Sequence, residues 1–393
     1  MLALLSLYPV VSQLAKMGSK NAAMQEKSLE ADNVAKSGLM DAISWFQRQG
    51  VQPVRQLPFY VYPDGAFHPR FNADPALSST TDESIGLVNV YDIDDSKGLK
   101  ARYEVRRQPD NVTFATNPVN PSAVHDITHL RVPGGAAGDG LVWTLESTGY
   151  VYREKNPAVP FNTAPNEIVG KSIVNTEIWA LQVDPPARAA LSVDNIEDVD
   201  IVNGFIRAPL NNGISHFQGD PVIAALDASV AAQTLYSPLA AVPAMSQVFG
   251  GIDASLMKHV ADVYVRDLVE LPSAGFPLMS LAYIQNPNVT ISGFKGSGIL
   301  VVDGNLTLTF GWPGIFKYNG LIYVDGDLTI QADLNEKFSV TGGVIATGRV
   351  NLQGNNLPIE IIYDENMINS VKSQIARYRQ SKPTYFVSSA LKK

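Results

Sequence analysis

Two short stretches carry side chains whose types and spacing could bind a metal ion. In HDITH, residues 125–129, two histidines stand four positions apart. On a helix they would share one face, where a third ligand could complete a zinc site. The glutamate that acts as general base in such helical motifs is absent. The flanking residues VNPSAV and RVPGG favour a loop or strand, so we interpret the histidines as a surface pair.

The second stretch is DIDDSKG, residues 92–98, in which Asp92, Asp94 and Ser96 alternate as the oxygen ligands of a calcium loop do. An EF-hand requires glycine at the sixth position of the loop and glutamate at the twelfth. This chain has Lys97 and Tyr103 there. The sequence therefore favours a solvated turn between two strands, with a looser calcium site at the three residues as the alternative. No other cofactor is expected.

The elements that would position a site include an internal repeat. The segments GILVVDGNLTLT, GLIYVDGDLTIQ and GGVIATGRVNLQ begin at residues 298, 320 and 342, which are 22 residues apart. Apolar and polar residues alternate after the last glycine of each segment, which is the period of a half-buried strand. The equivalent positions are the glycines Gly304, Gly326 and Gly348, the first apolar residues Leu306, Leu328 and Val350, and the second apolar residues Leu308, Ile330 and Leu352.

Self-similarity at a fixed interval of this length is typical of a repeat architecture. We predict that each repeat is one coil of a β-solenoid and that the two apolar sets stack as internal ladders. The alternative is an antiparallel meander whose hairpins happen to match. A meander has no reason to keep the same spacing through three units, so the solenoid is favoured.

Catalytic signatures are missing from the sequence. It contains no G-x-S-x-G motif, no phosphate-binding glycine loop and no dinucleotide fingerprint. The outward positions of the predicted coils form a solubilising face without an acid/base pair. We therefore predict that the protein is not an enzyme. These outward residues are Asn305, Thr307, Asp327, Thr329, Arg349 and Asn351.

Composition narrows the class of protein further. With 393 residues, 45% of them hydrophobic and 17% charged, the chain can bury a core and suggests two or three domains. The net charge of −8 argues against a protein that coats nucleic acid. The chain has no cysteine, which excludes a disulfide framework, a thiolate metal site and a cysteine nucleophile.

The N-terminus predicts one long helix. Its first residues, MLALLSLYPVV, are almost wholly apolar but too few to cross a bilayer, which takes about 20 residues. No basic segment precedes them, as a signal peptide would require. A helical pattern then continues over residues 2–49, with Leu39, Ala42 and Phe46 on one apolar face, and Gly50 ends it. Two unrelated core helices are the alternative.

The remaining segments predict an α+β fold in which strands pack on the second half of this helix. The expected strands are residues 86–93, 101–107, 142–152 and 167–183. We interpret residues 198–210 as an irregular first strand pair of the repeat region, residues 220–275 as mostly helical, and residues 364–381 as a last amphipathic helix. The predicted domains are a helix at 1–50, an antiparallel β domain at 51–186, a β-solenoid-like domain with a helical insertion at 187–364, and a C-terminal helix and tail at 365–393.

Several of these segments resemble a known family. The apolar start with a proline, LLSLYPVV, continues into a helix that ends SGLMDAISWFQRQ and is similar to the spine of a type IV pilin. The segments GLVWTLESTGYVYREKNPA and APNEIVGKSIVNTEIWAL, followed by the glycine-punctuated repeats, resemble the large PilX-like minor pilins, which are pilus assembly proteins. Pilins of this family begin with a longer apolar stretch, with glutamate at its fifth residue, after a leader. We therefore expect further residues before Met1.

The resemblance implies a role in a fibre. Such a protein sits in the bacterial inner membrane before assembly and then on the cell surface, in contact with other major and minor pilins. It would prime assembly or decorate the fibre tip in adhesion, motility or DNA uptake, with a glycan, host or other surface as ligand of the solenoid. A secreted β-solenoid adhesin and a carbohydrate-active β-helix protein are the alternatives. The helix residues implied to pack in the fibre are Leu2, Leu4, Leu5, Leu7, Pro9, Val10 and Val11.

Overall fold

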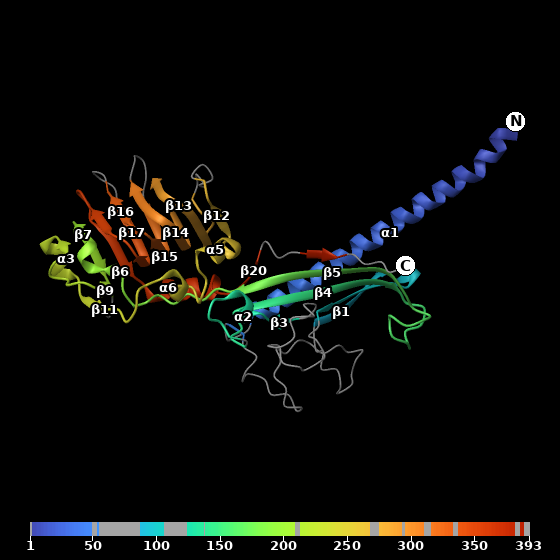
Figure 1. Cartoon of the computed structure of the whole chain (residues 1–393), viewed down its shortest axis with the longest axis horizontal. Coiled ribbons are helices and arrows are strands. Elements are labelled where there is room, and N and C mark those ends of the chain that lie inside the picture. Colours follow the sequence, from blue (N-terminus) through green and yellow to red (C-terminus); the bar gives the residue numbers. More distant parts are fainter. Residues whose placement is uncertain are drawn as a thin grey trace, which may run out of the picture. The chain divides into compact units, whose positions relative to one another are not determined.

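The protein combines one long N-terminal helix with sheets, and most of its elements are strands (Figure 1). The computed structural model forms two compact units, Met1–Trp179 with Tyr378–Lys393, and Ala180–Arg377. It describes residues 2–48, 53–54, 87–105, 124–136, 138–208, 213–267, 275–292, 295–309, 316–332, 337–381 and 386–388. Of residues 51–69, which follow the predicted helix, the structure describes only 53–54.

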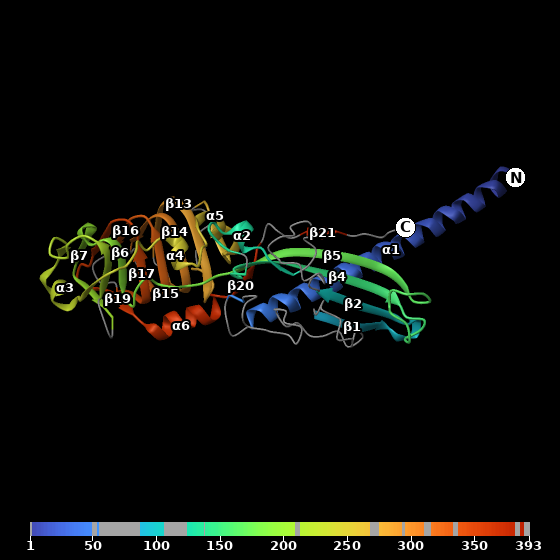
Figure 2. The ribbon, with the colours of Figure 1, turned by 60° about the horizontal axis from the view of Figure 1, so that its bottom comes forward.

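The first unit packs helix α1 on an antiparallel sheet (Figure 2). The sheet has the strand order β1-β2-β4-β5-β20, with β3 beside β4 and β21 beside β5. The four strands expected from the sequence are thus β1, β2, β4 and β5. The elements are α1 (Leu2–Gln47), β1 (Leu87–Asp94), η1 (Asp95–Lys97), β2 (Leu99–Val105), β3 (His125–Asp126), α2 (Thr128–Arg131), β4 (Val142–Arg153), β5 (Glu167–Ala180), β20 (Tyr378–Gln380) and β21 (Phe386–Ser388).

Helix α1 approaches the sheet closely because two strand positions lack side chains. A Cβ at Gly149 of β4 would collide with the carbonyl oxygen of Ala31, and one at Gly170 of β5 with that of Lys27. The backbones of helix and strands therefore touch, which larger residues would prevent. Around this contact the helix buries a row of apolar side chains, half of them alanines. These are Ala31, Ala35, Leu39, Ala42, Ile43 and Phe46.

The helix is longer than the sheet beside it. At about 1.5 Å per residue, the 46 residues of α1 span about 69 Å. The longest strand of the sheet, β5, has 14 residues and spans about 46 Å at ~3.3 Å per residue. The apolar N-terminal part of α1 therefore continues past the end of the sheet, as Figures 1 and 2 also show.

The second unit is built mainly from parallel strands. Its elements are β6 (Leu191–Asn195), η2 (Ile196–Asp198), β7 (Val199–Val202), β8 (Gly204–Arg207), β9 (Ile214–Gln218), β10 (Ala225–Leu226), α3 (Ala228–Gln233), β11 (Tyr236–Pro238), α4 (Met245–Val248), α5 (Ala254–Val260), β12 (Val263–Val265), β13 (Ser280–Ser292), β14 (Lys295–Thr309), β15 (Phe316–Asp325), β16 (Leu328–Gln331), β17 (Phe338–Ala346), β18 (Val350–Gln353), β19 (Ile359–Tyr363) and α6 (Glu365–Gln374).

The register of these strands aligns the residues that the sequence analysis had aligned. Leu306 pairs with Leu328, which pairs with Val350, all in parallel strands. The second apolar set, Leu308, Ile330 and Leu352, pairs in the same way, and both sets are buried. A single sequence offset of 22 residues thus holds through β14, β16 and β18.

Hydrophobic patterning explains which strand faces are covered. In β16 and β18 buried residues alternate with half-buried or exposed ones, because one face meets solvent. The run of residues 299–302 in β14 is wholly buried, as are 321–324 in β15. Their outer side is covered by the segment around α4 and by α6. Tyr323, for example, donates its hydroxyl to the carbonyl of Pro243 and packs edge-on against Phe249.

The order of strands in the stack differs from their order in the chain. The early strands β6, β7 and β8 pair in parallel with the late strands β17, β18 and β19. The predicted irregular first pair at residues 198–210 is therefore misplaced, since its strand β7 lies beyond the third repeat and not before the first. Two runs of chain separated by about 150 residues meet at this junction, and no local pattern could show it.

One helical prediction is wrong and another is too long. The described residues of the range 220–275 form only the short helices α3, α4 and α5, and other residues of the range pair as β10, β11 and β12. Parallel pairing with β7, β9 and β13 overrides the helix propensity of this alanine-rich segment. The helix predicted for residues 364–381 ends at Gln374, and Tyr378–Gln380 becomes strand β20 beside β5.

The second unit is an insertion between neighbouring strands of the first. The chain leaves the first sheet at the end of β5 and returns to it as β20, so the predicted C-terminal region 365–393 is divided between both units. The two crossings lie side by side. The backbone N–H of Leu181 donates to the carbonyl of Arg377 at 3.2 Å.

Strand stacking in the second unit should tolerate no side chain at Gly320. Its φ is +140°, and an added Cβ would collide with the carbonyl oxygen of Gly298 on the adjacent strand. We expect Gly320→Ala to lower the free energy of unfolding by about 2 kcal/mol or more, measured by denaturant titration.

A matched control lies on the adjacent strand, β17. A Cβ at Gly343 would have its nearest neighbour at 3.6 Å, in ordinary contact with Leu321. Gly343→Ala should be neutral or slightly stabilising. Equal destabilisation by the two substitutions would contradict the close strand contact at Gly320.

The inner and outer sides of β16 offer a second comparison. Leu328 is 1% exposed between Leu306 and Val350, so Leu328→Asp buries an unpaired charge and should cost about 3 kcal/mol or more. Thr329, one residue on, is half-buried on the outer side, and Thr329→Asp should leave the thermal midpoint nearly unchanged. Similar midpoints for both variants would show that the stack is not dry inside.

Candidate interaction surfaces

The candidate calcium ligands lie in the β1–β2 hairpin, where lysines and backbone already engage them. Asp94 caps the short helix η1: its Oδ1 accepts from the backbone N–H of Ser96 at 3.1 Å and from the Ser96 hydroxyl at 2.6 Å. Its Oδ2 lies 2.8 Å from Lys97 Nζ. Hydrogen bonds from Lys97 and then Ser96 lower the pKa of Asp94 to about 2. The loop is thus a capped, ion-paired turn.

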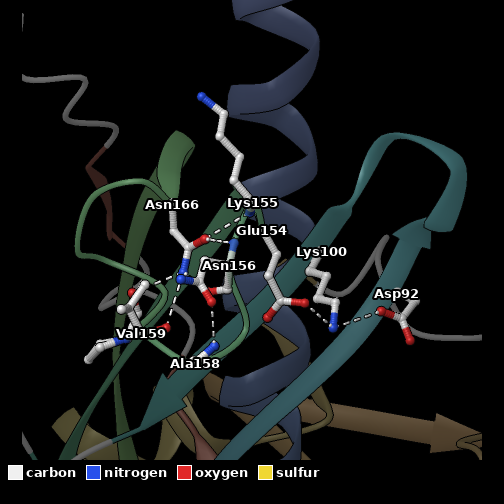
Figure 3. Close-up of polar contacts among 9 residues, drawn as sticks. Asp92, Lys100, Glu154, Lys155, Asn156, Ala158, Val159 and Asn166 are labelled. Carbon is white, nitrogen blue, oxygen red and sulfur yellow. Dashed lines mark hydrogen bonds and ion pairs between the residues drawn. The ribbon is translucent and has the colours of Figure 1, made fainter.

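Asp92 takes part in a different ion pair (Figure 3). Lys100 Nζ lies 3.5 Å from Asp92 Oδ1 and 2.7 Å from Glu154 Oε2, and the bond to Glu154 is the main cause of its raised pKa. The backbone N–H of Glu154 also donates to Gly98. Among the residues that the structure describes, no group of three His, Cys, Asp or Glu side chains could hold a metal ion. The cluster therefore ties the β1–β2 hairpin to β4.

The β4–β5 loop beside this cluster is organised by one buried side chain, Asn166 (Figure 3). Its Oδ1 accepts from the backbone N–H groups of Lys155 and Asn156 at 2.8 and 2.9 Å. Its Nδ2 donates to the carbonyls of Asn156, Val159 and Pro160. One asparagine thus satisfies five backbone groups, and the loop has a defined conformation. The sequence analysis missed this role.

The same loop folds back over the outer face of the sheet. Phe161 packs against Tyr150 and Tyr152 at ring-centroid distances of 5.0 and 5.3 Å. The guanidinium of Arg102 lies 4.7 Å from the centre of the Phe161 ring, and Arg102 is ion-paired with Glu104 at 2.7 Å. The hairpin end is therefore a rigid, mixed aromatic and charged surface.

The residues of HDITH serve the fold through Asp126, which the sequence analysis did not select. This carboxylate is 1% exposed. Its Oδ1 accepts from the backbone and hydroxyl of Thr128, and its Oδ2 from the N–H groups of Gly138 and Gly140. The histidines flank it on different elements, His125 on β3 and His129 on α2. Asp126 thus fixes the turn between them and the start of β4.

The solvent-facing side of the parallel stack carries neutral polar side chains, which we call the outer polar face. Within it, the hydroxyls of Ser292 and Thr309 are 2.9 Å apart, and Gln353 donates to Asn351 at 2.7 Å. Each of these side chains can donate and accept hydrogen bonds. The face comprises Thr290 and Ser292 of β13, Thr307 and Thr309 of β14, Thr329 and Gln331 of β16, and Asn351 and Gln353 of β18.

A second set of outward residues lies at the corner before these strands and stabilises the backbone. Asn305 Nδ2 donates to Asn288 Oδ1 at 3.1 Å, and Asn305 Oδ1 accepts from the N–H of Asp327 at 2.9 Å. Asp327 Oδ1 in turn accepts from the N–H of Arg349 at 2.8 Å. These side chains cap the next strand along the stack.

The apolar N-terminal segment is the remaining candidate surface. The structure describes the helical backbone of Leu2–Val11 but not its side chains. Among the described residues, no helix is both long enough and apolar enough to cross a membrane. Of the predicted site residues, the structure brings together the members of each apolar ladder, which pair on neighbouring strands. The packing role of the N-terminal leucines stays a prediction.

Comparisons with known proteins add little to this geometry. No protein-family model matches the chain, and no curated protein matches it. Among solved structures, it is similar to the competence-associated pilin ComZ from Thermus thermophilus, with 9% sequence identity and a TM-score of 0.22, covering 93% of this chain and 98% of that chain. A likeness at this TM-score carries no argument, so the function must be argued from the residues themselves.

Glu146 on the outer face of β4 makes the stability of the first unit sensitive to pH. Burial raises its pKa from 4.5 to about 7, although the charge of Lys171 and a hydrogen bond from Asn175 oppose the shift. Since the folded pKa exceeds the unfolded one, the stabilisation is fully present below pH 4.5 and is lost as the pH rises through 7. Glu146→Gln should therefore raise the thermal midpoint at pH 8 relative to the unsubstituted protein.

The same substitution supplies its own control at low pH. At pH 4 both side chains are neutral, so the two midpoints should agree. A midpoint difference that is the same at pH 4 and pH 8 would contradict the raised pKa.

Proposed function

We propose that the protein is a minor pilin of a type IV pilus or a related pseudopilus, which helps to prime assembly or decorates the fibre tip. The observation that carries this proposal is the construction of helix α1. Its C-terminal half is fixed to an antiparallel sheet by backbone contact at Gly149 and Gly170. Its N-terminal part continues beyond that sheet and begins with an apolar sequence. A helix with one anchored and one free apolar part suits packing between subunits.

In this proposal the free part of α1 contacts other major and minor pilins through Leu2, Leu4, Leu5, Leu7, Pro9, Val10 and Val11. Before assembly the same segment would hold the protein in the inner membrane. After assembly the protein would be part of a pilus on the cell surface. The helix is then the assembly element and the sheet is its carrier.

We further propose that the second unit is a β-solenoid with 22-residue coils that displays a binding surface. The in-register pairing of Leu306, Leu328 and Val350 supports the coils. The outer polar face supports a binding role, because it presents neutral donors and acceptors in regular rows. A glycan or another polar cell surface suits such a face, whereas nucleic acid would require clustered Lys and Arg.

The proposal assigns no catalytic residue, and the protein would act by binding and positioning. Two of the outward residues, Asn305 and Asp327, use their side-chain oxygens to cap the next strand. A carbohydrate-active solenoid enzyme would instead lose activity when one acidic side chain is replaced, and a secreted adhesin would act without being assembled into a fibre. The experiment must distinguish the proposed pilin from these two alternatives.

The insertion topology allows a clean test. Leu181 and Arg377 are joined by a backbone hydrogen bond, so residues 182–376 can be replaced by Asn-Gly, a two-residue turn that suits an antiparallel hairpin. We expect the shortened protein to fold and to enter pili in a strain that lacks the natural gene. Adhesion of these cells should be lost, while the full chain restores it.

Two results would contradict the proposed function. One is normal pilus number and normal adhesion in the strain without the gene. The other is cleavage of a polysaccharide by the purified protein that is abolished by a single acidic substitution. A matched strain carrying Thr307→Asp and Thr329→Asp should assemble normally and show reduced adhesion, which locates the function on the outer polar face.

A further inference from the structure

The attachment of the second unit to the first consists of two strands that belong to the same sheet. One crossing leaves the end of β5, and the other enters the start of β20, which lies beside β5. The hydrogen bond between Leu181 and Arg377 links the two crossing segments. Tension that the covalent chain carries from the second unit therefore reaches the first unit at the end of β5 and the start of β20.

Strand β5 runs in the same direction as helix α1. Near its start, Gly170 contacts the carbonyl of Lys27. Near its end, Trp179 pairs with Val142, whose neighbour Trp143 packs on Phe46 at a ring-centroid distance of 5.2 Å. A pull between the N-terminal side of α1 and the end of β5 thus acts along the strand.

The pairing of β5 with β4 resists such a pull in shear. The two strands are paired in antiparallel register from Val142 opposite Trp179 to Arg153 opposite Glu167. Hydrogen bonds of an antiparallel pair lie perpendicular to the strands. A load along the strand therefore strains many bonds together, whereas a load across it would break them one at a time.

The other crossing is fixed to the helix by Tyr378, the first residue of β20, which is fully buried. Its ring packs edge-on against Phe46 at 5.1 Å, and its carbonyl accepts from Gln47 Nε2 at 2.9 Å. Its hydroxyl accepts from the N–H of Val54 at 2.7 Å and donates to the carbonyl of Gly140. One side chain thus joins the returning strand to the end of α1 and to the loop before β4.

We infer that β5 and β20 form a load-bearing joint, in which tension between helix α1 and the inserted unit acts in shear along β5 and is shared with the helix through Tyr378. The inference rests on the proposed function for the source of the load, since a fibre-borne binding unit is pulled when its ligand is held. Both crossings lie at the same end of the sheet. Tension on the inserted unit therefore pulls at that end, and tension on the N-terminal side of α1 pulls at the other.

Single-molecule pulling on the full chain tests the joint. The chain has no cysteine, so Gln25→Cys in α1 and Pro186→Cys just after β5, both at exposed positions, provide two unique attachment points for optical tweezers. We expect Tyr378→Phe, which removes only the hydroxyl bonds, to lower the rupture force of the first unit. Gln47→Ala, which removes the bond to the Tyr378 carbonyl and leaves the core intact, should also lower it.

The matched control is Tyr103→Phe. Tyr103 is likewise a buried tyrosine of the first unit, and its hydroxyl donates to Asp41 of α1, but it lies on β2, which the load does not pull directly. Denaturant titration of each variant gives its loss of stability. At a comparable loss of stability, Tyr378→Phe should lower the rupture force more than Tyr103→Phe.

Two results would overturn the inference: an unchanged rupture force in both Tyr378→Phe and Gln47→Ala, or an equal fall in Tyr103→Phe. The measurement uses the isolated protein and needs no pilus. If the pulling experiment contradicts the joint, the adhesion experiment still tests the proposed function. If the adhesion experiment contradicts the proposed function, the pulling result still stands.

Discussion

The backbone contact between helix α1 and strands β4 and β5 is the constraint on which the first unit depends. Gly149 and Gly170 bring the helix to within backbone contact of the sheet, which sets the position of the helix along β5. That position in turn places Phe46 beside Trp143 and Tyr378. Strand β20 returns to the sheet with Tyr378 buried against this end of the helix.

The second unit depends on a different constraint, the in-register stacking of parallel strands. Each strand adds the same residue type above its predecessor, so apolar side chains meet inside and polar side chains meet at the corner. Asn305 and Asp327 can each cap the next strand because that strand is their direct neighbour in the stack. The early strands of the second unit pair with its late strands. The chain also enters and leaves this unit at neighbouring positions, where Leu181 is hydrogen-bonded to Arg377.

Much of the fold could be predicted from the sequence where the signal is local or periodic. The helix over residues 2–49 and the four main strands follow from their hydrophobic periods, and the residues aligned at intervals of 22 are those that pair. The junction of β7 with β18 could not be predicted, because its two strands are far apart in the chain. The segment 220–275 was misread for a related reason: its alanine-rich composition favours helix, but pairing with distant strands decides its structure.

The candidate surfaces were less accessible to sequence reasoning. Asp126 and Asn166 each satisfy several backbone groups of a loop, and such roles depend on the loop conformation that they create. Asp92 and Asp94 have the spacing of metal ligands, but Lys97 in the same stretch and Lys100 just after it engage them. The composition of a short stretch therefore does not show whether its charges are already paired.

In-cell photo-cross-linking from Leu7 tests the central claim most directly. The claim is that the free part of α1 packs among pilus subunits. A photoreactive amino acid at Leu7, introduced in the natural host, should give a covalent product with a pilus subunit in the sheared-fibre fraction. The same amino acid at Thr163, on the exposed β4–β5 loop, should give much less of it. Recovery of the protein without any such product from Leu7, or with equal products from both positions, would contradict the account.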